Sequence, residues 1–130
     1  MSNRKVIVTD KAPKAKAPLS QAVVANGMVY VSGTTPFDLE RKMAPEFPEQ
    51  MRQVMENMKA ALEAAGSSLK DVVKVNVFLT DIKNFATMNE IYASYWEEGN
   101  YPARTTIEAP MAVPNMMLEI ECTAIVSSGA

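Results

Sequence analysis

The segment YPARTTIE, residues 101–108, places one arginine inside a stretch that otherwise has the pattern of a strand. Pro102 fixes its own φ and pushes Tyr101 into an extended conformation, so the chain enters this strand in a set direction. Arg104 keeps its charge in a protein and needs carboxylate, phosphate or carbonyl partners. Two interpretations follow: a structural ion pair, or a receptor for the carboxylate of a ligand.

The composition narrows the possible chemistry. The chain has 130 residues, of which 48% are hydrophobic and 22% charged, as expected of one domain (1–130) with a sizeable core. The net charge of -2 argues against a protein that holds nucleic acid on a basic surface. The chain has no histidine, which removes histidine bases, Ser/His dyads and most zinc sites. We therefore expect no metal, and any catalysis must use carboxylates, arginine, hydroxyls, backbone groups and water.

The expected location is the cytoplasm. Residues 1–10 lack the apolar region of a secretory signal, and no apolar run approaches the length of a membrane span. The single cysteine, Cys122, excludes an internal disulfide framework. We expect no membrane partner.

Local patterns predict most of the elements. Asn26-Gly27 between two apolar runs predicts a hairpin over 20–32 with a type I′ turn. Apolar residues at helical spacing predict helices over 49–65, ended by Gly66, and over 84–98. Strands are expected over 4–9, 72–79, the Arg104 segment and 117–126, with residues 1–18 forming an N-terminal strand and loop and 72–79 buried on both faces.

This order of elements predicts an α+β fold of split βαβ type, with a mixed sheet and two helices on one face. The other face has no element left in the chain to cover it, so a second subunit is expected to do so. We expect the Arg104 strand to pair antiparallel with the last strand, with Arg104 opposite Glu121 and Thr106 opposite Glu119. In that register all four side chains share the uncovered face, and an interfacial ion pair is the alternative to a ligand site.

Several motifs together resemble the reactive-intermediate deaminase family of RidA or YjgF type. The segments that carry the resemblance agree in order and spacing over nearly the whole of residues 20–126. They are PARTTIE (102–108), LEIE (118–121), SQAVVANGMVYVSGTTPFD (20–38) and ENMKAALEAAGSSLKDVVKVNVFLTDIKNFATMNEIYASYW (56–96).

The resemblance implies a chorismate-mutase-like, ferredoxin-like fold and a homotrimer with active clefts between subunits. It also implies hydrolysis of reactive 2-imino acids to 2-oxo acids and ammonia, with a small carboxylate as substrate and no cofactor. Two alternatives remain: a trimer that binds a carboxylate metabolite as a sensor without turnover, and an RNA-cleaving or translation-inhibiting protein. The acidic balance and the lack of histidine disfavour the second.

The resemblance assigns roles residue by residue. Arg104 matches the family's carboxylate-binding arginine and Glu119 its water-positioning glutamate. Asn89 and Gly33 match its ligand-binding asparagine and glycine. Two further substrate-binding positions depart from the pattern: Thr106 replaces the cysteine of deaminating members, and Leu19 replaces their tyrosine. The role of Glu121 is left open, and the loss of the tyrosine points to substrates other than the smallest imino acids.

Overall fold

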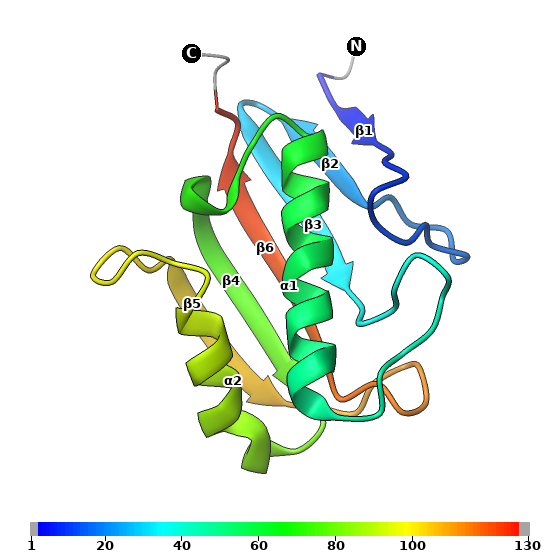
Figure 1. Ribbon diagram of the computed structural model, residues 1–130. Helices are drawn as coiled ribbons and strands as arrows, with labels where there is room; N and C mark the ends of the chain where they lie inside the picture. The colour runs from blue at the N-terminus through cyan, green and yellow to red at the C-terminus, as the bar shows by residue number, and fades with distance from the viewer. Residues whose placement is uncertain (1–2, 128–130) are drawn as a thin grey trace.

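The core lies between one helix and the central strands of a single sheet. The computed structural model describes residues 3–127, and Figure 1 shows both helices on the same face of that sheet. The strands are β1 (Lys5–Ile7), β2 (Ala22–Ala25), β3 (Met28–Thr34), β4 (Val72–Leu79), β5 (Ala103–Glu108) and β6 (Leu118–Ile125). The helices are α1 (Phe47–Ala64) and α2 (Phe85–Ala93), with short 3₁₀ turns η1 (Leu69–Asp71) and η2 (Ile82–Asn84). The predicted α+β fold with two helices on one face is confirmed.

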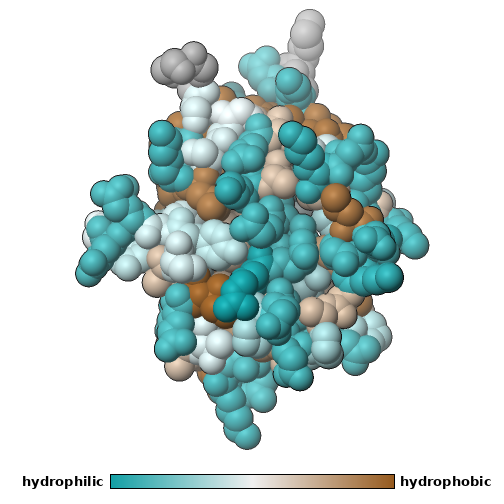
Figure 2. Space-filling view, viewed as in Figure 1, coloured by the Kyte–Doolittle hydropathy of each residue, from teal (hydrophilic) through white to brown (hydrophobic). Residues whose placement is uncertain are grey.

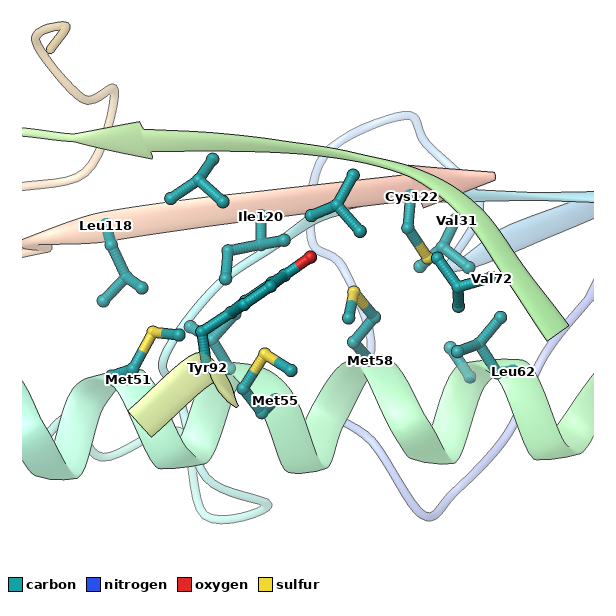
Figure 3. Packing of buried hydrophobic residues seen from close by; sticks show 14 of the residues in the cluster. Val31, Met51, Met55, Met58, Leu62, Val72, Tyr92, Leu118, Ile120 and Cys122 are labelled. Atoms are coloured by element: carbon teal, nitrogen blue, oxygen red, sulfur yellow. The ribbon is translucent and has the colours of Figure 1, made fainter. Parts of the chain in front are cut away.

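Helix α1 packs on the sheet through a stripe of flexible apolar side chains. Met51, Met55, Met58 and Leu62 are fully buried. Figure 3 shows them directed at the strand residues that include Ile120. Methionine fills irregular space well, because it is unbranched and has three rotatable bonds. The methionines of α1 therefore form much of the helix side of the core.

The hairpin between β2 and β3 has the predicted turn. Asn26 and Gly27 both have positive φ, 51° and 76°, as a type I′ turn requires. Ala25 pairs with Met28 directly across it. The turn therefore sets the register of this hairpin.

Helix α1 begins two residues before the predicted start, because Pro48 fits the first turn, where no helical N–H bond is needed. It ends as predicted at Gly66, which has φ 79°. The Ser67 N–H donates to the Leu62 carbonyl at 2.9 Å, closing a Schellman motif. The glycine thus turns the chain back toward β4.

Helix α2 ends five residues before its predicted end. It ends at Ala93, and Ser94 donates both its N–H and its hydroxyl to the Ile91 carbonyl. The chain then continues in tighter turns, in which the Tyr95 N–H donates a hydrogen bond to the Tyr92 carbonyl. The side-chain hydroxyl competes for a helical acceptor and helps to end the helix there.

The predicted pairing of β5 with β6 is wrong. The strand order is β1-β2-β3-β6-β4-β5, so β4 lies between β6 and β5. Strand β5 is an edge strand and runs parallel to β4, as Figure 1 shows. A parallel pair needs a crossover connection, and α2 supplies it. The antiparallel neighbour of β6 on this side is β4.

This topology reverses the predicted face of Arg104. Val75 of β4 lies opposite both Arg104 and Cys122, and Val77 lies opposite both Thr106 and Ile120. Residues directly opposite each other point to the same side of a sheet. Arg104 and Thr106 therefore share the helix-covered face, whereas Glu119 and Glu121 lie on the opposite one.

The second face of the sheet has no covering element among residues 3–127. It carries several exposed apolar residues, Val6, Tyr30, Ile107 and Ile125. Strand β4 is accordingly buried on one face and only half-buried or exposed on the other, where burial on both faces was predicted. By contrast, Figure 2 shows that the side bearing the helices is mostly hydrophilic.

Candidate functional site

The guanidinium of Arg104 lies between β5 and α2. Its Cζ is 4.9 Å from the ring centroid of Tyr92 and 5.8 Å from that of Phe85. Its Nη1 is 3.9 Å from the sulfur of Met88, a weak acceptor. The ion pairs formed among residues 3–127 do not include Arg104. Within one chain, therefore, Arg104 is not part of the structural ion pair that was one interpretation of the sequence.

A hollow of about 390 Å³ lies beside this arginine. Asn89 of α2 and Arg104 of β5 both line it, together with Tyr101 and Pro102 from the segment that leads into β5. The structure thus brings together two of the predicted site residues. An arginine with free N–H groups and a nearby amide can receive a carboxylate through a bidentate, charge-assisted contact.

Glu119 lies on the other side of the molecule's central strands, against the bulge in β3. The register of β3 with β6 shifts between Val31 and Thr34. A Cβ at position 33 would lie 2.6 Å from Oε2 of Glu119, which only glycine avoids. Gly33 therefore leaves the space that the Glu119 carboxylate occupies.

A second hollow, of about 370 Å³, contains this carboxylate. Leu19, Gly33 and Glu119 all line it, with Val113 and Met116 adding apolar wall. Leu19 and Glu119 therefore border the same hollow. Leu19 is 53% exposed, so its side chain is available to a ligand.

Two amide side chains, Asn57 buried and Gln21 partly buried, hold the loops around this second hollow, and sequence reasoning did not single them out. Asn57 of α1 donates to the carbonyls of Thr35 and Phe37 at 2.9 and 2.7 Å. Gln21 donates to three carbonyls of residues 9–13 and accepts from the Thr9 N–H. A polar residue inside the apolar stripe of α1 was the signal for Asn57, because a buried amide must find partners.

The two acidic residues of β6 have different surroundings. Burial, and secondarily the charge of Glu121, raise the pKa of Glu119. Glu121 instead accepts a hydrogen bond from Asn76 Nδ2 at 3.0 Å. Glu119 is thus the carboxyl group whose protonation is favoured by its environment, as a proton-transferring group requires.

Thr106 lies two residues beyond Arg104 on the same face but lines neither hollow. Its hydroxyl is buried and has no hydrogen-bond partner among the described residues. Thr106 therefore differs from the other predicted site residues, which all border open space.

The two hollows share no lining residue. Arg104 points to the helix-covered side of β5, whereas Glu119 lies two strands away and leans toward β3. One chain therefore has two separate hollows, one beside an arginine and one beside a glutamate.

Neither a metal site nor a membrane helix is found among residues 3–127. No group of three or more cysteine, aspartate or glutamate side chains is arranged to hold a metal ion there. In the same part of the chain, no helix combines the length and apolar character needed to cross a membrane.

Comparison with known proteins identifies the family. Residues 9–126 match the family described as Endoribonuclease L-PSP, and the chain belongs to this family, which includes the RidA/YjgF-type proteins. The RutC family protein PH0854 of Pyrococcus horikoshii is 43% identical over 93% of this chain and 97% of its own length. The Escherichia coli protein named "Putative reactive intermediate deaminase TdcF" is 37% identical over 96% of this chain and 99% of its own.

Solved structures agree with this assignment. RidA from the Antarctic bacterium Psychrobacter sp. PAMC 21119 superposes with a TM-score of 0.89 at 43% identity, covering 94% of this chain and 99% of that one. E. coli TdcF with bound serine also gives a TM-score of 0.89, at 36% identity and with 95% and 99% covered. The fold is therefore the chorismate-mutase-like α+β fold that the resemblance implied.

The raised pKa of Glu119 predicts how its replacement changes stability with pH. The folded protein disfavours the ionised form of Glu119, so its pKa is higher in the folded than in the unfolded chain. Below the unfolded pKa of about 4.3, Glu119 is protonated in both states and its ionisation costs no stability. As the pH rises through the higher folded pKa, the folded protein loses stability relative to the unfolded chain. Glu119→Gln should therefore raise the melting temperature at pH 7, and the gain should shrink toward pH 4.

Thermal unfolding of both proteins across this pH range tests the prediction. Glu90→Gln, on the exposed surface of α2, changes the net charge equally and serves as the control. A Glu119→Gln protein that is no more stable than wild type at pH 7 would contradict the assigned environment of this carboxyl group.

Proposed function

We propose that this protein hydrolyses reactive 2-imino acids to 2-oxo acids and ammonia. The observation that carries the proposal is Arg104, a half-buried arginine beside a hollow and without an ion pair among residues 3–127. Such a cation is suited to the carboxylate that every 2-imino acid carries. The name of the E. coli relative and the serine bound in its structure support the same class of ligand.

The chemistry follows from the groups available. Arg104 holds the substrate carboxylate, and Glu119 orients a water molecule toward the imine carbon and accepts its proton. The proton passes to the imine nitrogen as the C–O bond forms. The resulting carbinolamine then loses ammonia and becomes the 2-oxo acid. Because an imine is already electrophilic, positioning supplies much of the acceleration, and the reaction as proposed uses no cofactor.

The complete site is proposed to form between subunits of a homotrimer. The arginine and glutamate half-sites are separate in one chain, and the open sheet face exposes Val6, Tyr30, Ile107 and Ile125. A second copy that covers this face buries those residues. It can also place the half-site of one subunit next to the complementary half-site of its neighbour. The reaction is proposed to occur in the cytoplasm, in keeping with a chain that has one cysteine.

Metabolite sensing is the second candidate, because the TdcF structure holds serine, a stable amino acid. A sensor would bind carboxylates in the same cleft without releasing ammonia. The family description also names an endoribonuclease, but a net charge of -2 and the absence of histidine do not favour RNA cleavage. Ammonia release therefore separates the first proposal from both alternatives.

The activity is tested with an amino-acid oxidase that generates imino acids in the presence of this protein. Wild type should accelerate imine decay and ammonia release, and Arg104→Ala should abolish both, losing at least ~2 kcal/mol of ligand binding. Arg104→Lys should lose nearly as much activity, because the lysine ammonium cannot make the planar, bidentate contact that a guanidinium makes with a carboxylate. Wild type that binds 2-oxo acids but releases no ammonia would instead favour the sensor.

The inter-subunit site predicts complementation between two inactive variants. Arg104→Ala lacks the cation, and Glu119→Gln should slow turnover by roughly 10²–10⁴-fold. Co-expression of the two should restore roughly a quarter of the wild-type activity, because about that share of randomly assembled sites receives both intact residues. Each variant expressed alone is the control. If the co-expressed variants are no more active than either variant alone, one chain supplies both Arg104 and Glu119 to a site.

Leu19 predicts the preferred substrate side chain. Leucine presents apolar surface and no donor, and Val113 and Met116 extend that surface in the same hollow. Imines of leucine and phenylalanine should therefore be better substrates than the imine of alanine, by at least the ~1–3 kcal/mol that one methylene is worth in an apolar pocket. Leu19→Tyr should shift the ranking toward alanine. An identical ranking in both proteins would remove Leu19 from the pocket.

A further inference from the structure

The cation of Arg104 lies against aromatic faces, and no acid pairs with it among residues 3–127. The Cζ atom lies 4.9 Å from the Tyr92 ring centroid, within the distance at which a guanidinium is attracted to a π face. The Phe85 ring adds a second, longer contact at 5.8 Å. Both rings belong to α2, so the helix that crosses from β4 to β5 also carries the support for the arginine.

Tyr92 is rigid and uncharged, which suits this role. Its side chain is 4% exposed and packs in the core, as Figure 3 shows. Burial raises its pKa to about 12, and the nearby Arg104 charge only partly offsets that rise. Its hydroxyl has no hydrogen-bond partner among the described residues. The ring face is therefore what Tyr92 offers to Arg104, and its hydroxyl is dispensable for that contact.

We infer that Tyr92, assisted by Phe85, positions Arg104 for carboxylate binding by supporting the guanidinium without occupying its N–H groups. An internal carboxylate would also fix the arginine, but it would compete with the substrate for the same donors. An aromatic face engages the π surface of the guanidinium and leaves its edge available for a bidentate contact. This inference rests on the carboxylate-binding part of the proposed function and is independent of turnover.

The deciding comparison is Tyr92→Phe with Tyr92→Met. Phenylalanine keeps the ring and removes only the unpaired hydroxyl, whereas methionine keeps apolar bulk and removes the π face. With 4-methyl-2-oxopentanoate as the probe, calorimetry should show Tyr92→Phe within about twofold of wild type and Tyr92→Met weakened by about tenfold. Turnover, where present, should show the same defect of Tyr92→Met mainly in KM.

Two controls separate positioning from general damage. Tyr95→Met alters a partly buried aromatic residue of the next turn, and it should leave the affinity unchanged, because the ring contacts of Arg104 among the described residues are with Phe85 and Tyr92. Proton NMR of the folded wild type should show the side-chain resonances of Arg104 shifted upfield by the Tyr92 ring. The resonances are assigned by their loss in Arg104→Lys. This readout needs no variant of Tyr92.

The inference is overturned if Tyr92→Met binds the probe as well as wild type, or if Tyr92→Phe loses as much affinity as Tyr92→Met. Absence of the upfield shift in wild type overturns it as well, even where Tyr92→Met fails to fold. A failure of the proposed function would give a different result. Ammonia release would be absent, whereas the affinities for the 2-oxo acid and the upfield NMR shift would be as expected.

Discussion

Strand β5 lies parallel to β4, and this pairing determines where the charged groups of the protein are found. Two parallel strands cannot be joined by a tight turn, so helix α2 must carry the chain from the end of β4 back to the start of β5. The crossover places α2 over β5 and directs Arg104 toward the helix, next to Tyr92. Had β5 paired with β6, Arg104 would have faced the carboxylates of β6 and formed an internal ion pair.

Separation of these charges leaves each half-site electrostatically incomplete. Arg104 has no acid within ion-pair distance among residues 3–127, and Glu119 has a raised pKa because of its burial and, secondarily, because of the charge of Glu121. Both conditions cost stability, since a partly buried charge without a partner is unfavourable. They are what a binding cleft requires, because the anion and the water that complete it arrive with the ligand. In the proposed homotrimer, a second copy of the chain would both cover the open sheet face and complete the electrostatics of each half-site.

The local elements could be predicted from the sequence, whereas the position of β5 could not. Asn26-Gly27, the helical spacing of apolar residues in α1 and Gly66 each depend on nearby residues, and the turn, the helix and the helix end that they predict were confirmed. The side-chain pattern of residues 103–108 indicates a strand but does not identify the strand with which it pairs. The nine-residue connection from β5 to β6 is long enough either for a hairpin or for a connection that passes across β4. The resemblance named the residues that line the two hollows, although Thr106 lines neither. Asn57 and Gln21 were missed because their partners are backbone carbonyls distant in sequence.

The two departures from the family pattern fall on different parts of this geometry, and their consequences differ accordingly. Thr106 follows Arg104 on the helix-covered face, but its hydroxyl is turned into the protein and borders no open space. Leu19 borders the Glu119 hollow and is exposed there beside an apolar wall. The half-site that would recognise a carboxylate is thus intact, and the change of surface falls where the rest of a ligand would lie. Under the proposed function, such a pocket would keep its contact with the carboxylate common to all 2-imino acids and would select among their side chains.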